Sequence, residues 1–241
     1  MKGSPVTAQN TDAENNGHGK LRPTRVVIVE DEPLFRDMLI EYLNRQATIE
    51  VVGLAGNGRD ALKLVEEKRP DVVLLDIELG SEPDGIRAGH MIKAAHPATG
   101  IVVLTMHNDK EYLASVPEKK AAGWSFLLKQ SIRDGASLVR AIEGAAWGLV
   151  SFDPAAMERL RPRRRSTLER LTLTQITVLK EMATGYTDAA IGKKLGIAEG
   201  DVARMAMTIY DDLHITSYQA LDQRVKAVLT YLRETVEQPR V

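Results

Sequence analysis

Charged and hydroxyl side chains directly follow four short apolar runs in the first half of the sequence. They are Glu30 and Asp31, Asp76, Thr105, and Lys129. In open parallel sheets, functional groups gather just beyond the carboxyl ends of the strands. If the four runs are parallel strands, these side chains meet at one edge of a sheet. Three carboxylates in one place repel one another, so the sequence predicts a cation among them.

Mg²⁺ suits such an all-oxygen site, because it binds through a few carboxylates and retains water ligands. With Mg²⁺ and Lys129 beside it, a carboxylate can attack a phosphoryl group, and Thr105 can donate a hydrogen bond to a transferred oxygen. Each residue alone has an ordinary alternative. Asp76 could cap a turn, Thr105 could be a β-former, and Lys129 could be a solvated strand end. Their joint occurrence at strand ends favours phosphoryl chemistry.

Short apolar runs and amphipathic helices alternate around these residues. The predicted strands are residues 26–29, 49–54, Val72–Asp76, 101–104 and Trp124–Leu128. The predicted helices begin at Pro33 and span residues 59–68, 86–95, 111–122 and 132–145. This alternation predicts right-handed βαβ units, and therefore an α/β doubly wound fold with a parallel five-stranded sheet.

The composition is that of an ordinary globular protein of 241 residues with a formal net charge of −1. A polyanionic partner would therefore bind at a local patch. The absence of cysteine excludes disulfides and thiolate metal sites, and it fits a reducing, cytoplasmic compartment. No apolar run is long enough to cross a membrane. Residues 1–23 are polar and rich in Gly and Pro, and we expect a disordered tail.

Five motifs carry a resemblance to a known family. They are Val29-Glu30-Asp31-Glu32, Leu74-Leu75-Asp76, Asp84-Gly85, Val103-Leu104-Thr105 and Phe126-Leu127-Leu128-Lys129. With these motifs, residues 24–146 resemble the receiver domain of two-component response regulators, whose fold is flavodoxin-like. The resemblance implies that Asp76 accepts a phosphoryl group from a sensor histidine kinase.

The resemblance also implies roles for the neighbouring residues. Mg²⁺ would be held by Asp31 and Asp76, by Glu30 through water, and by the backbone carbonyl of Glu78. Thr105, Phe126 and Lys129 would form the switch, and residues 105–126 the output face. Two departures concern loop geometry and the lifetime of the phosphoryl group: residues 77–85 form a longer loop without the usual Met-Pro pair, and Gln130 follows Lys129. Glu78 and His107 would tune hydrolysis, or they are solvated loop residues.

The chain changes character after Trp147. We assign residues 147–167 to a linker, with a helix start at Asp153-Pro154. The basic run at residues 161–166 is a solvated linker or, alternatively, an arm that contacts phosphates. Residues 168–241 show helical spacing, with a strong pattern from Leu171 to Val236. Two of the predicted helices are joined by a tight turn that contains Gly196, which indicates a small all-α helix-turn-helix domain.

This last region resembles the C-terminal module of the NarL/LuxR (FixJ) class of regulators. The motifs are Leu171-Thr172, Val178-Leu179, Gly185-Tyr186-Thr187, Ala190-Ile191, Leu195-Gly196-Ile197 and Val202. The resemblance implies that the helix at residues 199–213 enters the major groove of DNA. The expected contact residues are Lys193, Lys194, Glu199, Asp201, Val202, Arg204, Met205 and Thr208. This helix is net acidic, and Gln175 replaces the usual Glu.

Two functions of different class remain open. The first is a transcription regulator that binds DNA through its helix-turn-helix, with phosphorylation of Asp76 favouring a homodimer on two half-sites. The second is a response regulator whose acidic C-terminal module binds protein or dimerises instead. We find no signature of a separate substrate pocket, so we do not expect a dedicated enzyme.

Overall fold

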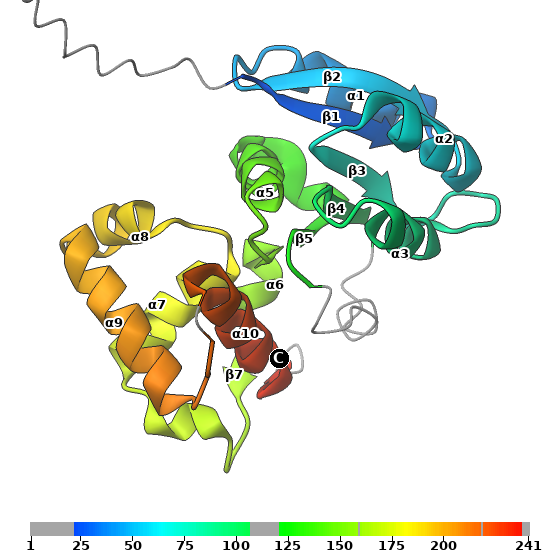
Figure 1. The fold of residues 1–241 in the computed structure, drawn as a ribbon. Helices are drawn as coiled ribbons and strands as arrows, with labels where there is room; N and C mark the ends of the chain where they lie inside the picture. The colour runs from blue at the N-terminus through cyan, green and yellow to red at the C-terminus, as the bar shows by residue number, and fades with distance from the viewer. Residues whose placement is uncertain (1–21, 107–120, 159, 218, 238–241) are drawn as a thin grey trace, which may run out of the picture.

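The computed structural model describes residues 22–106, 121–158, 160–217 and 219–237. Figure 1 shows an α/β unit followed by a helical unit. Three expectations fall wholly or mostly outside the described residues. They concern the tail at residues 1–23, the helix at residues 111–122 and the role of His107.

A parallel sheet forms the centre of the α/β unit, with the strand order β2-β1-β3-β4-β5-β6. The strands are β1 (Thr24–Val29), β2 (Ile49–Ala55), β3 (Val72–Asp76), β4 (Gly100–Thr105), β5 (Trp124–Leu128) and β6 (Ser151–Phe152). The five predicted strands are confirmed. The sixth was not predicted: it comes from the segment assigned to the linker, and it pairs with the outer edge of β5.

Four described helices cover the two faces of this sheet. They are α1 (Pro33–Leu43), α2 (Gly58–Lys68), α3 (Gly85–Ala95) and α5 (Ala136–Ala146). Alternate residues of the strands pack with α1 and α5 on one face and with α2 and α3 on the other. Every residue of β3 is buried, and each buried Val or Leu contributes about 1.5–3 kcal/mol. This apolar strand therefore holds its terminal Asp76 in a fixed place.

The last helix of the α/β unit begins later than the sequence pattern predicts. Residues Lys129–Asp134 form a 3₁₀ helix, and α5 starts only after Gly135. Gly135 adopts a left-handed backbone conformation with φ of 62°, and a side chain there would collide with the ring of Tyr42. The glycine therefore ends one helix and begins the next.

The helical unit contains α6 (Pro154–Glu158), α7 (Leu173–Ala183), α8 (Asp188–Leu195), α9 (Glu199–Asp212) and α10 (Ala220–Arg233). Local signals fix its helix ends: Thr172 and Gln175 form a capping box at α7, and Gly196 ends α8 with φ of 71°. The expectation of an all-helical region was wrong at its end. Strand β8 (Thr235–Glu237) pairs antiparallel with β7 (Leu160–Pro162), which lies in the predicted linker.

The hydrophobic core continues from the sheet into the helical unit. One cluster of buried apolar residues includes the face of the sheet that packs against α2 and α3, then Phe126, Phe152 and Met157, and the core between the C-terminal helices. The two units are therefore packed together. Among the described residues, no helix combines the length and the apolar character needed to span a membrane.

Lys93 of α3 is a buried cation, with its Nζ 3.1 Å from the carbonyl oxygen of Pro97. Burial lowers the pKa of Lys93 from 10.5 to about 8. Between these values the unfolded chain binds more protons than the folded chain, so stability rises with pH across this window. We expect Lys93→Met to stabilise the protein by about 1–3 kcal/mol at pH 7 and to flatten this rise. Urea denaturation at pH 7 and pH 9.5 measures the free energy of unfolding of both proteins. If this free energy changes equally with pH in wild type and Lys93→Met, burial of the lysine charge does not cost stability.

Candidate functional site

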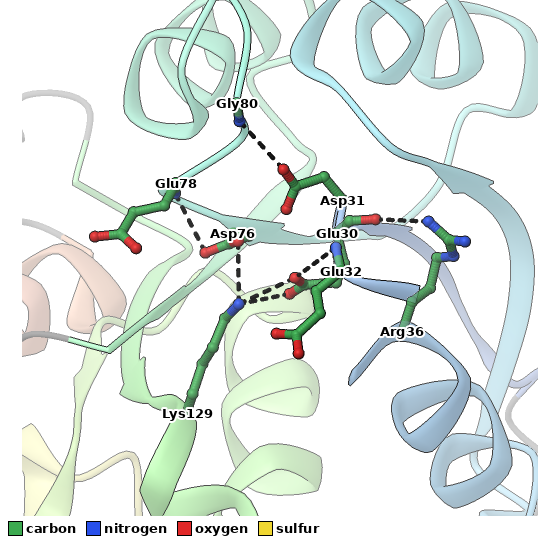
Figure 2. Close-up of polar contacts among 8 residues, drawn as sticks. All are labelled: Glu30, Asp31, Glu32, Arg36, Asp76, Glu78, Gly80 and Lys129. Atoms are coloured by element: carbon green, nitrogen blue, oxygen red, sulfur yellow. Dashed lines mark hydrogen bonds and ion pairs between the residues drawn. The ribbon is translucent and has the colours of Figure 1, made fainter. Parts of the chain in front are cut away.

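Four charged side chains meet at the carboxyl ends of β1, β3 and β5 (Figure 2). The carboxylates of Glu30, Asp31 and Asp76 each offer one oxygen, and these oxygens lie within 4.8 Å of one another. Lys129 Nζ lies 3.0 Å from Asp76 Oδ2 and 2.9 Å from Glu30 Oε2. Since β4 lies between β3 and β5, the long lysine side chain reaches across one strand. The fold thus brings together the three carboxylates and the lysine that the sequence places at the strand ends.

The ammonium of Lys129 is held on several sides. It donates hydrogen bonds of 3.0 Å to both Glu30 Oε1 and Asp76 Oδ2, and it lies 4.7 Å from the centre of the Phe35 ring. Burial alone would lower the pKa of Lys129, but the bonds to Glu30 and Asp76 outweigh it and raise the pKa above its ordinary value. The lysine therefore stays protonated and keeps a fixed positive charge beside Asp76.

Glu30 is the most deeply buried of the acidic residues, at 0% exposure. Burial raises the pKa of Glu30, the hydrogen bond from Lys129 opposes this, and the charge of Asp76 adds to the rise. Its backbone is held as well, because Arg36 Nη1 donates to the Glu30 carbonyl oxygen at 2.9 Å. This contact could not be predicted from sequence patterns, because Arg36 looks like any other charged residue of a surface helix.

The loop after β3 positions the remaining acidic residues. The N–H of Gly80 donates to Asp31 Oδ2 at 3.2 Å, and the N–H of Glu78 donates to Asp76 Oδ1 at 3.3 Å. The Glu78 side chain is exposed and extends away from the cluster, so only its backbone lies close (Figure 2). Asp84 then caps α3 by accepting a bond from the N–H of Arg87 at 2.7 Å.

The two other residues assigned to the switch are also buried near this edge. Thr105 ends β4 and pairs with Leu128, the residue before Lys129. Phe126 lies farther back on β5, stacked between the rings of Trp124 and Phe152 at 5.9 and 5.5 Å between centroids. The partner Phe152 was not expected from the sequence, because it belongs to the unpredicted strand β6.

Comparison with known proteins identifies the family. The sequence profile of the response regulator receiver domain matches residues 26–143. The uncharacterized transcriptional regulatory protein YxjL of Bacillus subtilis (strain 168) is 32% identical over 187 residues, which cover 74% of this chain and 84% of that protein. The chain belongs to the two-component response regulators of the NarL/LuxR class. It is a regulatory protein of a class that controls transcription, and not a dedicated enzyme.

Other relatives cover a similar share of this response regulator. The transcriptional regulatory protein DegU of Brevibacillus brevis is 28% identical over 224 residues, which cover 84% of this chain and 93% of DegU. Among solved structures, the Salmonella typhimurium RcsB response regulator matches with a TM-score of 0.49 and 22% identity, covering 88% of this chain and 99% of RcsB.

Helix α9 of the response regulator is the one expected to contact DNA, and one face of this helix is exposed. This face consists of Gly200, Arg204, Met207, Thr208 and Asp211. Val202 lies on the opposite side at 0% exposure. The prediction that Val202 contacts DNA is therefore wrong, because its side chain belongs to the core. Met207 was not among the predicted contacts, but it is 65% exposed on the same face as Arg204 and Thr208, as its spacing from them indicates.

The other residues predicted to contact DNA differ in how exposed they are and in whether they form ion pairs within the chain. Glu199 is exposed, whereas Asp201 and Met205 are half-buried. Arg204 forms an ion pair with Asp201 one turn earlier. Lys194 pairs with Glu181 at 2.7 Å and is 4.8 Å from the Tyr186 ring centre, and Lys193 is exposed.

One acidic residue of α9 has a structural partner in α7. Gln175 Nε2 donates to Asp212 Oδ2 at 3.0 Å, while Gln175 Oε1 accepts from the N–H of Thr172 at 2.8 Å. A glutamate at position 175 would place two carboxylates side by side at this contact. The glutamine and the aspartate therefore belong together, and Asp212 is turned toward α7.

Proposed function

We propose that Asp76 accepts a phosphoryl group from a histidine of a sensor kinase, and that this controls the output of the helical unit in the cytoplasm. The contact that carries the proposal is the one from Lys129 to Glu30 and Asp76, with Asp31 facing them. An aspartate that only capped a turn at the end of a strand would not require a buried lysine beside it. Three carboxylates near one ammonium leave an excess of negative charge, which favours a second cation.

The donor set fits Mg²⁺. Glu30, Asp31 and Asp76 supply only oxygen ligands within a span of 4.8 Å, and Asp31 is exposed, which leaves room for the waters that Mg²⁺ retains. We propose Asp31 and Asp76 as direct ligands, Glu30 as a ligand through water, and the backbone carbonyl of Glu78 as the fourth contribution. When bound, the ion would offset charge on the transferred phosphoryl oxygens.

The transfer itself requires a nucleophile and a fixed positive charge. A carboxylate oxygen of Asp76 forms a bond to phosphorus while the bond from phosphorus to the kinase imidazole breaks, and the imidazole nitrogen keeps the electron pair. Asp76 Oδ1 accepts a long 3.3 Å bond from the N–H of Glu78, whereas Oδ2 accepts a 3.0 Å bond from Lys129, so among the described contacts Oδ1 is the more weakly held oxygen. Lys129 offsets the charge of the developing acyl phosphate, and we assign to Thr105 the donation of a hydrogen bond to it.

Replacing Asp31 by alanine is expected to weaken Mg²⁺ binding by about tenfold or more, because a direct oxygen ligand is lost. Titration of Mg²⁺ followed by the fluorescence of the buried Trp124 measures the change. Asp37→Ala is the matched control, since Asp37 is an exposed carboxylate on α1. Equal affinities for wild type and Asp31→Ala would remove Asp31 from the metal site.

For the output, we propose that phosphorylation favours a homodimer whose α9 helices enter the major groove at two half-sites. The exposed residues Lys193, Arg204 and Thr208 are the contacts that this role would use. Membership of a class of transcriptional regulators supports the proposal, as does the intact framework of α8, the turn at Gly196 and α9.

The observed ion pairs favour a second candidate, in which α9 binds a protein partner. Arg204 is paired with Asp201, and Lys194 is paired with Glu181. A cation already paired within the chain gains less from a phosphate, and exposed acidic residues forfeit the counterion-release contribution to DNA affinity. In this case α9, which is net acidic as a whole, would dock on a basic protein surface through its exposed acidic residues, Glu199 and Asp211.

A salt titration of binding to genomic duplex fragments separates the two candidates. If α9 binds DNA, affinity of the phosphorylated protein falls as salt rises, with a slope of about −0.9 for each phosphate contact. Asp201→Asn should bind several-fold more tightly than wild type, because it removes a negative charge and frees Arg204. No binding at low salt, with phosphorylation of Asp76 verified by mass, would rule out the DNA role and favour the protein partner.

A further inference from the structure

Residues 151–153 connect the two units, and we call them the clasp. Strand β6 of the clasp runs parallel to β5, with Ser151 beside Ser125 and Phe152 beside Phe126. The two serine hydroxyls are joined by a 2.8 Å hydrogen bond, and the two rings stack at 5.5 Å with planes 1° from parallel. All four side chains are buried. Water therefore does not compete for these contacts, and the clasp is closed on the edge of the sheet.

Asp153 holds the clasp against the end of β5 that lies nearest to the proposed phosphoryl site. Its Oδ2 accepts a hydrogen bond of 3.1 Å from the N–H of Leu128. Its Oδ1 accepts bonds of 2.9 and 3.2 Å from the N–H groups of Ala155 and Ala156 in the first turn of α6. Hydrogen bonds to a buried carboxylate are strong, and the helix dipole adds to them. One side chain therefore joins α6 to the residue that directly precedes Lys129.

The clasp also lies against the turn that follows α7. A Cβ at Gly185 would come within 2.9 Å of the Cβ of Ser151, so the absence of a side chain allows this approach. Beside it, Arg140 of α5 donates to the carbonyl oxygen of Thr184 at 3.3 Å and lies 4.2 Å from the centre of the Tyr186 ring. The helical unit is thus held on the α/β unit by contacts that converge on the clasp.

We propose that the clasp is the coupling element of this response regulator, released from β5 when Asp76 is phosphorylated. The inference rests on the proposed function of Asp76. A phosphoryl group on Asp76 gives Lys129 new oxygen partners, so the end of β5 must shift with its lysine. The N–H of Leu128 then loses its alignment with Asp153. Packed contacts of this kind change between discrete arrangements and not by degrees, so the clasp opens as a unit and frees α6 and the helical unit.

The variant Asp153→Asn tests the clasp without a change in size. Asparagine has one acceptor oxygen, which can cap α6 or receive the bond from Leu128, but not both. Phe152→Leu is the second variant, since it keeps an apolar side chain and loses the ring stacking. Asn57→Ala is the matched control, because Asn57 caps α2 through the N–H of Asp60, away from the clasp.

The chain has no cysteine, so spin labels can be placed at Asp37→Cys on α1 and Leu173→Cys on α7. Pulsed dipolar spectroscopy then measures the distance between the units in the full chain. We expect one narrow distance for unphosphorylated wild type and control, and a longer, broader component after treatment with acetyl phosphate and Mg²⁺. Unphosphorylated Asp153→Asn and Phe152→Leu should show this open component at least about fivefold more than wild type.

Coupling is reciprocal, so opening the clasp must also favour the phosphorylated state. Asp153→Asn should bind Mg²⁺ and beryllofluoride, a phosphoryl mimic, more tightly than wild type, by up to the factor by which phosphorylation raises the ratio of open to closed protein. Distances in both variants that match wild type, with and without phosphorylation, would overturn the clasp. If mass spectrometry shows that wild type takes up no phosphoryl group, the proposed function fails. The unphosphorylated variants still decide whether the clasp holds the helical unit.

Discussion

Replacement of Asp76 by asparagine is expected to abolish phosphoryl uptake, with a fall in rate of at least about 1000-fold. Asparagine has nearly the same shape, but its neutral amide cannot act as the nucleophile. Lys129 also lies 2.9 Å from Glu30, so we expect the lysine to keep a partner in the variant and the fold to be retained. Intact-mass measurement after incubation with acetyl phosphate and Mg²⁺ gives the uptake directly.

The exposed carboxylate of Asp37 provides the comparison for this result. Asp37→Asn removes the same charge from the same unit, and we expect uptake at the wild-type rate. If Asp76→Asn also takes up phosphoryl groups at that rate, a different carboxylate is the acceptor.

The second large effect is expected at Gly85, the first residue of α3. Its N–H donates to the carbonyl oxygen of Ile77 at 3.1 Å, and a Cβ at this position would collide with the backbone carbonyl of Asp76. A backbone atom in the centre of a sheet cannot move aside as a flexible side chain can. Gly85→Ala should therefore destabilise the protein by about 3 kcal/mol and slow phosphoryl uptake, because relief of the clash displaces Asp76.

Gly200→Ala serves as the matched substitution in the other unit. Gly200 is exposed near the start of α9, and the nearest atom to an added Cβ is the flexible end of Arg204 at 3.8 Å. Alanine favours helix, so we expect a gain of up to about 1 kcal/mol. Urea denaturation of both variants measures the difference. A Gly85→Ala protein as stable as wild type would show that the close approach to Asp76 is not rigid.

The clustering of the acidic residues and Lys129 could be predicted because each lies at the end of a short apolar run. In a parallel sheet, the ends of such runs meet at one edge whatever the detailed packing. The positions of Asp31, Asp76 and Lys129 follow from this rule. Their supporting contacts do not, because the bond from Arg36 to the Glu30 carbonyl depends on how α1 lies against β1.

The connection between the two units could not be predicted from sequence patterns. Strand β6 has two residues, which is too short to show a periodicity of two. Asp153 was predicted to begin a helix, and it does cap α6, but its second bond to Leu128 spans 25 positions. The partnership of Gln175 and Asp212 spans 37 positions. Such pairs are set by tertiary packing, and a single sequence carries no local sign of them.

Whether Asp76 is the phosphoryl acceptor is decided by locating the phosphoryl group on the protein. The protein is treated with a small phosphoryl donor and Mg²⁺, the acyl phosphate is reduced with borohydride, and the modified residue is found by peptide mass spectrometry. We expect modification of Asp76 alone, and none when Mg²⁺ is removed by chelation. Modification of any other carboxylate, or modification of Asp76 that persists without Mg²⁺, would contradict this expectation.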